Sequence, residues 1–171
     1  MLSGYKFLSI AVFIFAAFLS QNALSRDYSE WLERCDEYRD LVESILVTEQ
    51  VSKDFYYLMV AESKCTDKAV SNKGARGFWQ LMTPTSRHYG CSNPDDLECA
   101  TKAAAKYLKR LSDEFVDFND VIAAYNMGGH NYARGGRSRS DEASGLIERV
   151  NAIIKQDSDR VDSKAGEDKD G

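Results

Sequence analysis

The chain has 171 residues, a formal net charge of −5 and 43% hydrophobic residues, which suits one domain of ordinary size with a substantial core. An acidic chain without a basic run gives no reason to expect a nucleic-acid partner. The two histidines, His88 and His130, lie far apart and no C-x-x-C pair is present, so we expect neither a metal nor a cofactor.

The N-terminal segment is typical of a targeting sequence. Residues 1–25 contain a single charged residue, Lys6, followed by the apolar block FLSIAVFIFAAFLS (Phe7–Ser20). This block is too short to span a bilayer comfortably and suits the core of a signal peptide. Small residues in ALS (Ala23–Ser25) follow where a signal peptidase reads. We expect a signal peptide over 1–25, a periplasmic or secreted protein, and no stable membrane span after cleavage, with an uncleaved anchor as the alternative.

Two helices are expected in the next part of the chain. Apolar residues recur at helical spacing in SEWLERCDEYRDLVESILVTEQ (Ser29–Gln50), and Ser29 is a candidate N-cap. KDFYYLMVAESK (Lys53–Lys64) is apolar all round, which predicts a second and deeper helix. Near its end the apolar run stops at an acid, Glu62.

The middle of the chain is expected to alternate between loop and helix. Residues 65–77 contain Gly74 and Gly77 and are typical of a loop. FWQLM (Phe78–Met82) suggests a short helical turn, and Pro84 fits the first turn of the helix after it. DDLECATKAAAKYLKRLSDEFV, residues 95–116, is rich in alanine and predicts the strongest helix of the chain.

Two further helices and a tail complete the expected organisation. NDVIAAYN (Asn119–Asn126) predicts a buried helix capped by Asn119, and DEASGLIERVNAII (Asp141–Ile154) an amphipathic one, with a glycine- and arginine-rich loop between them. DSDRVDSKAGEDKDG (Asp157–Gly171) is charged and poor in large apolar residues, which predicts a disordered acidic tail. The sequence thus predicts one all-α domain over 26–156, without strands.

All four cysteines lie in the part of the chain expected to be exported. In an oxidising compartment they predict two disulfides, for which three connectivities exist. Cys91 and Cys99 bracket the compact segment SNPDDLE, so we pair them. The pairing of Cys35 with Cys65 then follows by elimination.

Three blocks of residues, in a fixed order, carry the signal for function. They are ES (Glu62–Ser63), SNKGARGFWQLMTPTS (Ser71–Ser86) with YG (Tyr89–Gly90), and AAAKYL (Ala103–Leu108) followed by AAYNMGG (Ala123–Gly129). Together they resemble the catalytic domain of the soluble lytic transglycosylase (SLT) family, most like its membrane-bound lytic murein transglycosylase D branch. The resemblance covers residues 51–134, most of the expected domain.

The resemblance implies both a fold and an activity. The fold would be the lysozyme-like, mostly helical one of goose-type lysozymes and SLT domains. The activity would be cleavage of peptidoglycan glycan strands between N-acetylmuramic acid and N-acetylglucosamine, with Glu62 as the catalytic acid. The positions that match the family's substrate-binding groove are Ser71, Gln80, Met82, Tyr125 and Asn126.

Physical chemistry agrees with this role for Glu62. A glycosidic bond breaks when its leaving oxygen receives a proton, but a free glutamic acid, with a pKa of about 4.3, is mostly ionised near neutral pH. The apolar residues 55–61, with Trp79 and Met82, are expected to raise the pKa of Glu62. The resemblance implies that the ionised Glu62 then removes the proton of the muramic acid 6-hydroxyl, leaving a 1,6-anhydro end. Trp79 and Tyr132 can also stack on sugar faces, although Trp79 equally suits a core.

Two other functions are weighed against this one. A goose-type lysozyme-like hydrolase needs a second acid to position water, and neither Asp54 nor Asp67 has motif support for that role. A non-catalytic glycan-binding module of an envelope assembly has no reason to retain Glu62, Gln80 and Tyr125 together. The expected partner is the peptidoglycan glycan strand, with envelope or secretion-machine proteins as further candidates.

Overall fold

The computed structural model describes residues 26–135 and 137–167 and confirms the mostly helical prediction. Residues 1–25, where the signal peptide is predicted, lie outside the described residues. The elements are α2 (Ser29–Thr48), η1 (Lys53–Phe55), α3 (Tyr56–Ser63), β1 (Ala75–Arg76), β2 (Leu81–Met82), α4 (Thr83–His88), α5 (Leu97–Glu114), α6 (Phe118–Met127), α7 (Gly129–Arg134) and α8 (Asp141–Glu167). None of the helices in these described ranges is both long and apolar enough to cross a membrane.

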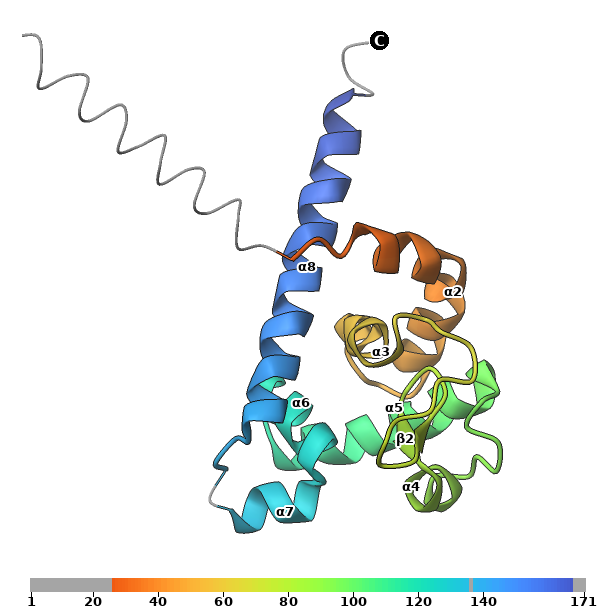
Figure 1. Cartoon of the computed structure of the whole chain (residues 1–171), viewed down its shortest axis with the longest axis vertical. Helices are drawn as coiled ribbons and strands as arrows, with labels where there is room; N and C mark the ends of the chain where they lie inside the picture. Colours follow the sequence, from red (N-terminus) through yellow and green to blue (C-terminus); the bar gives the residue numbers. More distant parts are fainter. Residues whose placement is uncertain (1–25, 136, 168–171) are drawn as a thin grey trace, which may run out of the picture.

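Helix α3 lies at the centre of the molecule, between α2 and α8 (Figure 1). Its residues Tyr56, Leu58, Met59 and Val60 have no exposed surface, as the apolar run predicts. The run begins with the short 3-10 helix η1, because the Ser52 hydroxyl accepts the Asp54 N–H and starts the chain in a tight turn. A helix surrounded in this way places the residues at its end next to the core.

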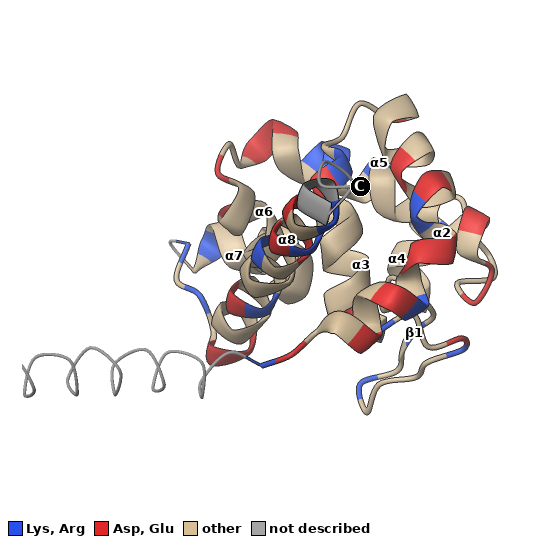
Figure 2. Cartoon of the chain, turned by 90° about the horizontal axis from the view of Figure 1, so that it is seen from above, with Lys and Arg blue, Asp and Glu red and all other residues tan. Residues whose placement is uncertain are grey.

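The longer helices bury one side each, as their sequence patterns predict. Leu32, Val42 and Leu46 of α2 are fully buried, while exposed acidic residues recur along the same helix (Figure 2). In α5, residues such as Ala104 and Leu108 are fully buried, and small alanine side chains let neighbouring helices approach closely. These faces enclose α3 in a common core.

At the start of two helices, aspartates rather than the predicted residues accept a backbone N–H. Ser29 is not the N-cap of α2, since Tyr28 occupies that position and the Asp27 carboxylate accepts the Ser29 N–H at 2.9 Å. Asn119 does not cap α6 either, because the helix begins earlier and the Asp117 carboxylate accepts the Asp120 N–H at 3.0 Å. An aspartate at the start of a helix also benefits from the positive end of the helix dipole.

Two loop regions contain structure that the sequence did not predict. The segment FWQLM is not a helical turn: its last two residues form β2, which pairs antiparallel with β1 in the register Ala75↔Met82 and Arg76↔Leu81. The glycine- and arginine-rich segment contains the short helix α7. Strands of two residues are too short to show alternation, so pattern reading cannot find them.

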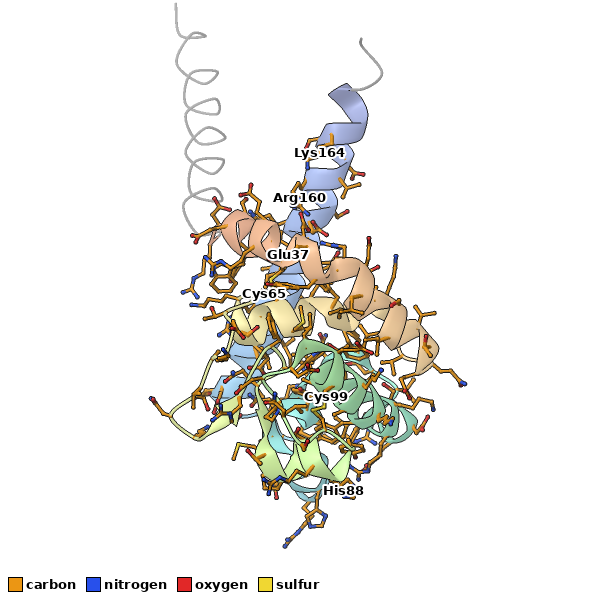
Figure 3. All side chains as sticks on the ribbon, turned by 90° about the vertical axis from the view of Figure 1, so that its right-hand side faces the viewer. Glu37, Cys65, His88, Cys99, Arg160 and Lys164 are labelled. Carbon is orange, nitrogen blue, oxygen red and sulfur yellow. A yellow bond between two sulfur atoms is a disulfide. The ribbon has the colours of Figure 1, made fainter. Side chains whose placement is uncertain are left out.

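The prediction of a disordered tail from Asp157 is wrong for residues 157–167, which continue α8 as helix. Asp157 is 3% exposed; its carboxylate accepts hydrogen bonds from Arg39 at 2.8 Å and from the Tyr57 hydroxyl at 2.7 Å. Arg160 donates to Asp36 of α2 at 2.9 Å. Figure 3 shows Arg160 where α8 passes α2, and Lys164 farther along α8. Partners on α2 and α3 thus order a segment whose composition suggested disorder.

Replacing Asp157 with alanine is expected to lower the free energy of unfolding by about 3 kcal/mol, because it leaves the part-buried Arg39 without its best-buried counter-charge. Burial alone would raise the pKa of Asp157, but the bonds from Tyr57 and Arg39 outweigh it and lower that pKa. Urea unfolding measures the loss. The matched control is Asp159→Ala, which breaks only an exposed pair with Lys155 and should cost under about 1 kcal/mol. Equal stability of the two variants would contradict the ordered role of this segment.

Both predicted disulfides are confirmed. Cys35 of α2 is bonded to Cys65, just beyond the end of α3, and Cys91 is bonded to Cys99 at the start of α5. The first bond joins two buried residues and ties the end of α3 to α2. It therefore fixes the helix end that carries Glu62.

Candidate active site

Helix α3 ends immediately after Glu62, and the local chemistry explains why. Lys64 and Cys65 both take left-handed backbone conformations, with φ of 55° and 51°, which stop a right-handed helix. The Ser63 hydroxyl donates to the Met59 carbonyl and accepts the Cys65 N–H at 3.1 Å, so that side chain fixes the turn. Glu62 thus lies on the last turn of a rigid helix rather than on a loop.

Two arginines hold the carbonyl end of α3. Arg149 of α8 donates to the Ala61 carbonyl, and Arg34 of α2 donates to the Lys64 carbonyl, both at 3.3 Å. The last carbonyls of a helix lack partners within the helix and carry partial negative charge, which attracts cations. The same partial charge disfavours a carboxylate at this end, so the helix itself favours the protonated form of Glu62.

The side chain of Glu62 lines a cavity of about 510 Å³. The structure brings all six predicted site residues to the wall of this one cavity, although they come from α3, the 65–82 region and α6. The lining residues are Glu62, Ser71, Asn72, Lys73, Ala75, Gln80, Leu81, Met82, Thr85, Tyr107, Tyr125, Asn126, Met127, Gly128 and Glu142. Co-location supports the predicted roles, which stay predictions.

The carboxyl group of Glu62 is partly buried, and burial raises its pKa from the ordinary 4.5 to about 7. The charge of Arg149 opposes this shift, whereas the charge of Glu142 adds to it. A carboxyl with a pKa near 7 exists in both protonation states close to neutral pH. It can therefore give up a proton and take one back, as an acid–base catalyst must.

Ser71 and Gln80 shape the wall of the cavity through the backbone. The Ser71 hydroxyl accepts the Ala75 N–H at 3.0 Å and closes the turn before β1. The Gln80 side chain donates to the carbonyls of Ala69 and Gly77, at 3.2 and 2.9 Å. Both polar side chains thus hold the loop as well as facing the cavity.

Gly77 is required where the 65–82 region meets the loop before α5. Its φ is 71°, and a β-carbon there would lie 1.9 Å from the Pro94 carbonyl oxygen. Only glycine allows so close an approach of two backbones. The contact sets the path of the chain that leads into Gln80, whose own φ of 46° is left-handed.

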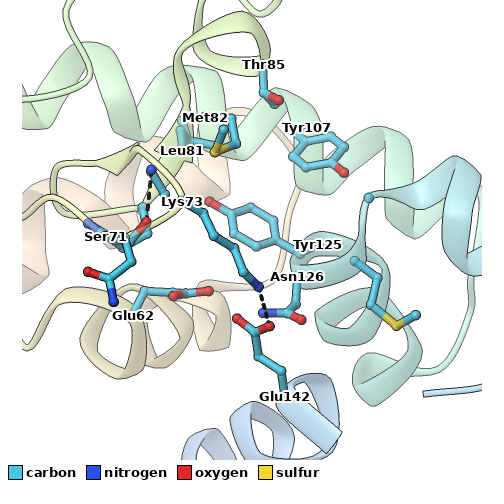
Figure 4. A pocket seen from close by; sticks show the side chains of 15 residues that line it. Glu62, Ser71, Lys73, Leu81, Met82, Thr85, Tyr107, Tyr125, Asn126 and Glu142 are labelled. Carbon is cyan, nitrogen blue, oxygen red and sulfur yellow. Dashed lines mark hydrogen bonds and ion pairs between the residues drawn. The ribbon is translucent and has the colours of Figure 1, made fainter. Parts of the chain in front are cut away.

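The Tyr125 hydroxyl is bonded to the backbone rather than to Glu62. It donates to the Trp79 carbonyl at 2.7 Å, and the side chain is 8% exposed. Burial raises the pKa of Tyr125 well above its usual value, and the nearby charge of Glu62 adds to the shift. Tyr125 therefore stays neutral and joins α6 to the segment that carries Gln80. Figure 4 shows Tyr125 among the side chains that line the cavity.

Tyr125→Phe is expected to lower the free energy of unfolding by about 1–3 kcal/mol, because it leaves the Trp79 carbonyl without a donor in a buried place. Urea unfolding of the two proteins gives the difference. Tyr89→Phe is the matched control: Tyr89 packs on the same row of rings, at 5.3 Å from Tyr107, and is only half-buried. An unchanged stability of the Tyr125 variant would show that this hydrogen bond contributes nothing.

Trp79 and Tyr132 do not line the cavity as sugar-stacking residues, because both are fully buried. The Trp79 ring N–H donates to the Thr101 hydroxyl at 2.9 Å, and the Tyr132 hydroxyl donates to Asp120 at 2.7 Å. The aromatic rings that line the cavity are instead Tyr107 and Tyr125, with centroids 5.4 Å apart.

Sequence reasoning missed two charged residues of the cavity wall, Lys73 and Glu142. They lie 69 positions apart, and Lys73 Nζ donates to a Glu142 carboxylate oxygen at 2.6 Å (Figure 4). Glu142 belongs to the first turn of α8, where an acid is expected for reasons of helix stability alone. Nothing in the local pattern indicated that α8 returns to the end of α3. Within residues 26–135 and 137–167, no cluster of residues is suited to hold a metal ion.

Comparison with known proteins gives one family and a small set of relatives. Residues 46–147 match the family described as "Transglycosylase SLT domain". The chain is 29% identical over 102 residues to the "Membrane-bound lytic murein transglycosylase D" of Escherichia coli strain K12, covering 56% of this chain and 23% of that protein. It is 28% identical over 105 residues to the "Transglycosylase" of Enterobacteria phage PRD1, covering 61% of this chain and 39% of that protein. The matched segment thus spans less than half the length of either relative.

Proposed function

Because the chain belongs to the transglycosylase SLT domain family, we propose that it is a peptidoglycan lytic transglycosylase. It cleaves the β-1,4 bond between N-acetylmuramic acid and N-acetylglucosamine and leaves a 1,6-anhydromuramic end. Glu62 acts first as acid and then as base. No metal or cofactor takes part.

In the first step, the protonated carboxyl of Glu62 gives its proton to the glycosidic oxygen. The bond from this oxygen to C1 of the muramic acid then breaks, and positive charge develops on the sugar. The N-acetyl group of the same sugar stabilises C1. Glu62 is left as a carboxylate next to the reacting carbon.

In the second step, the carboxylate of Glu62 accepts the proton of the muramic acid 6-hydroxyl while the 6-oxygen forms a bond to C1. This restores the protonated Glu62 and consumes no water. The attacking hydroxyl belongs to the same sugar, so ring closure has the proximity advantage of an intramolecular reaction. One carboxyl group is therefore sufficient for the whole cycle.

The observation that carries the proposal is the environment of Glu62. It lies within the segment that matches the family, on the wall of a cavity of about 510 Å³, and burial raises its pKa to about 7. A structural acid at a helix end has no need of a cavity or of a raised pKa. The combination is that of a general acid in a substrate cleft.

One observation favours a second function, that of a goose-type lysozyme-like hydrolase. Such an enzyme needs a second carboxylate to position water, and Glu142 lines the same cavity as Glu62. We favour the lytic route, because Glu142 is 61% exposed at the side chain and is already paired with Lys73. The identity of the product separates the two functions.

The test is mass spectrometry of purified peptidoglycan after digestion with the oxidised protein. The proposal expects muropeptides that are one water lighter than hydrolysed ones and carry no reducing muramic acid, from the wild type and from Glu142→Gln alike. Reducing ends that disappear with Glu142→Gln would establish the hydrolase instead. If well-folded protein releases no products, the remaining interpretation is a non-catalytic glycan-binding module.

We propose that the protein works outside the cytoplasm, in the periplasm or after secretion. The two disulfides support this, because such bonds persist in oxidising compartments. The catalytic domain is proposed to extend to residue 167 rather than 156, since α8 continues that far. Envelope or secretion-machine proteins remain proposed partners.

A further inference from the structure

Helix α8 lies beside α3 for part of its length (Figure 1). Its residues Glu142 and Arg149 bring two opposite charges to the region where α3 ends. Glu142 and Arg149 are seven positions apart, which is close to two helical turns and places them on one side of α8. Ala143, Leu146 and Val150 form the adjoining buried stripe of the helix. The packing of this stripe therefore fixes the backbone positions of Glu142 and Arg149.

Arg149 lies on the α3 side of this pair. Its guanidinium donates to the carbonyl of Ala61, the residue directly before Glu62, at 3.3 Å, and its side chain is only half-buried. A fixed positive charge next to a carboxyl group favours the ionised form. Arg149 thus opposes the effect of burial on Glu62.

Glu142 lies on the cavity side of the pair. It lines the same cavity as Glu62 and is held there by the 2.6 Å contact with Lys73. An exposed ion pair of this kind adds little to stability, but it holds the Glu142 carboxylate at the wall of the cavity. A negative charge there favours the protonated form of Glu62.

The other ionisable groups around Glu62 are either neutral or bonded to other partners. Glu142 and Arg149 are therefore the two charges that we expect to set its pKa. Tyr125 of α6 and Tyr107 of α5 line the cavity with pKa values raised by burial, so both are neutral near pH 7. Arg34 of α2 contacts the carbonyl of Lys64, beyond the helix end. Lys73 is engaged with Glu142.

We propose that Glu142 and Arg149 are positioning residues for the catalytic acid, with α8 holding one negative and one positive charge near the end of α3 that carries Glu62. This rests on the proposed function. Arg149 stabilises the carboxylate that ring closure needs as a base, and Glu142 stabilises the acid that bond cleavage needs. The two charges together keep both forms accessible near neutral pH.

The inference predicts opposite effects from two substitutions on the same helix. In the pH profile of kcat/KM, activity falls on the alkaline side as Glu62 loses its proton. Arg149→Met is expected to move this fall to higher pH by roughly one unit, and Glu142→Gln to lower pH by a smaller amount, because Glu142 is exposed and screened. Glycan-strand cleavage, followed by release of soluble muropeptides between pH 5 and 9, measures both shifts.

Two controls separate charge from structure. Arg149→Lys keeps the positive charge and should restore most of the wild-type profile. Glu148→Gln and Lys155→Met make the same charge changes at exposed sites on α8, and should leave the profile where it is. Raising the salt concentration should shrink the shift of Glu142→Gln, since exposed charges are screened.

A loss of overall activity with no movement of either profile would overturn the inference, and so would two shifts in the same direction. If the wild type releases no muropeptides at all, the proposed function fails, and the inference is then tested without activity. Titration of the Glu62 carboxyl carbon by NMR in the wild type and both variants should show the same two opposite shifts. Unmoved titration midpoints would overturn the inference on their own.

Discussion

Glu62→Gln is expected to lower glycan-strand cleavage by at least about a thousandfold while the fold survives. General acid–base catalysis by one positioned group is worth about 10²–10⁴-fold, and in the proposed mechanism a single carboxyl performs both proton transfers. Glutamine has nearly the same shape but can neither donate a proton to the leaving oxygen nor accept one from the 6-hydroxyl. The measurement is the rate of soluble muropeptide release at pH 6, where the wild-type acid is protonated.

The same variant makes a second prediction, on stability. The pKa of Glu62 is raised from 4.5 to about 7 by burial, so the folded state holds this proton more tightly than the unfolded state does. The stability that this provides is fully present below about pH 4.5 and is lost as pH rises through about 7. At pH 8 the wild type should therefore have lost up to about 3 kcal/mol that Glu62→Gln retains.

Urea unfolding at pH 5 and pH 8 tests this prediction. The stability difference between variant and wild type should move in favour of the variant as pH rises. Glu148→Gln is the matched control, because the same change at an exposed position on α8 should show no such trend. An active Glu62→Gln protein would show that another group is the acid, and a constant difference in stability would show that Glu62 is ionised in the folded protein at all these pH values.

Removal of the Cys35–Cys65 disulfide, as the double alanine variant, is expected to lower the free energy of unfolding by about 3–4 kcal/mol. The bond closes a loop with a sequence separation of 30, and the cost of losing such a constraint grows with loop length. For a domain with a total stability of about 5–15 kcal/mol this is a large fraction. Equilibrium unfolding of the two proteins measures the loss.

The second disulfide gives a matched comparison. Cys91–Cys99 has a sequence separation of 8, and its double alanine variant should lose about 2.5 kcal/mol. The first variant should also lose more activity at a temperature where both are folded, because Cys65 follows Glu62 by three residues and fixes the end of α3. Equal loss of activity in both variants would contradict a role of the first disulfide in holding the site.

The helices and the residues around Glu62 were predictable because short-range patterns determine them. The apolar run before Glu62 indicated a buried helix, and α3 has its central residues fully buried. The three sequence blocks indicated one cleft, and the structure places Glu62, Gln80 and Tyr125 on the wall of the same cavity. Local composition and motif order carried this information.

The errors of largest consequence concern contacts between distant parts of the chain. The charged neighbours of Asp157 indicate a disordered tail. Its partners Arg39 and Tyr57, however, lie 118 and 100 positions away in the sequence. Trp79 looked equally suited to sugar or core until its hydrogen bond to Thr101 placed it in the core. Glu142 gave no signal, because only the path of α8 brings it to the cavity. Such contacts depend on the tertiary fold, which no local pattern encodes.

The most direct test of the account is titration of the Glu62 carboxyl carbon by NMR in the folded, oxidised wild type, with the resonance assigned by its absence from Glu62→Gln. Burial in the cleft is proposed to keep this acid protonated close to neutral pH. We therefore expect a titration midpoint of about 7. A midpoint near 4.5, the ordinary value for a glutamic acid, would contradict it, because the proposed proton donor would then be a carboxylate at the pH at which it has to act.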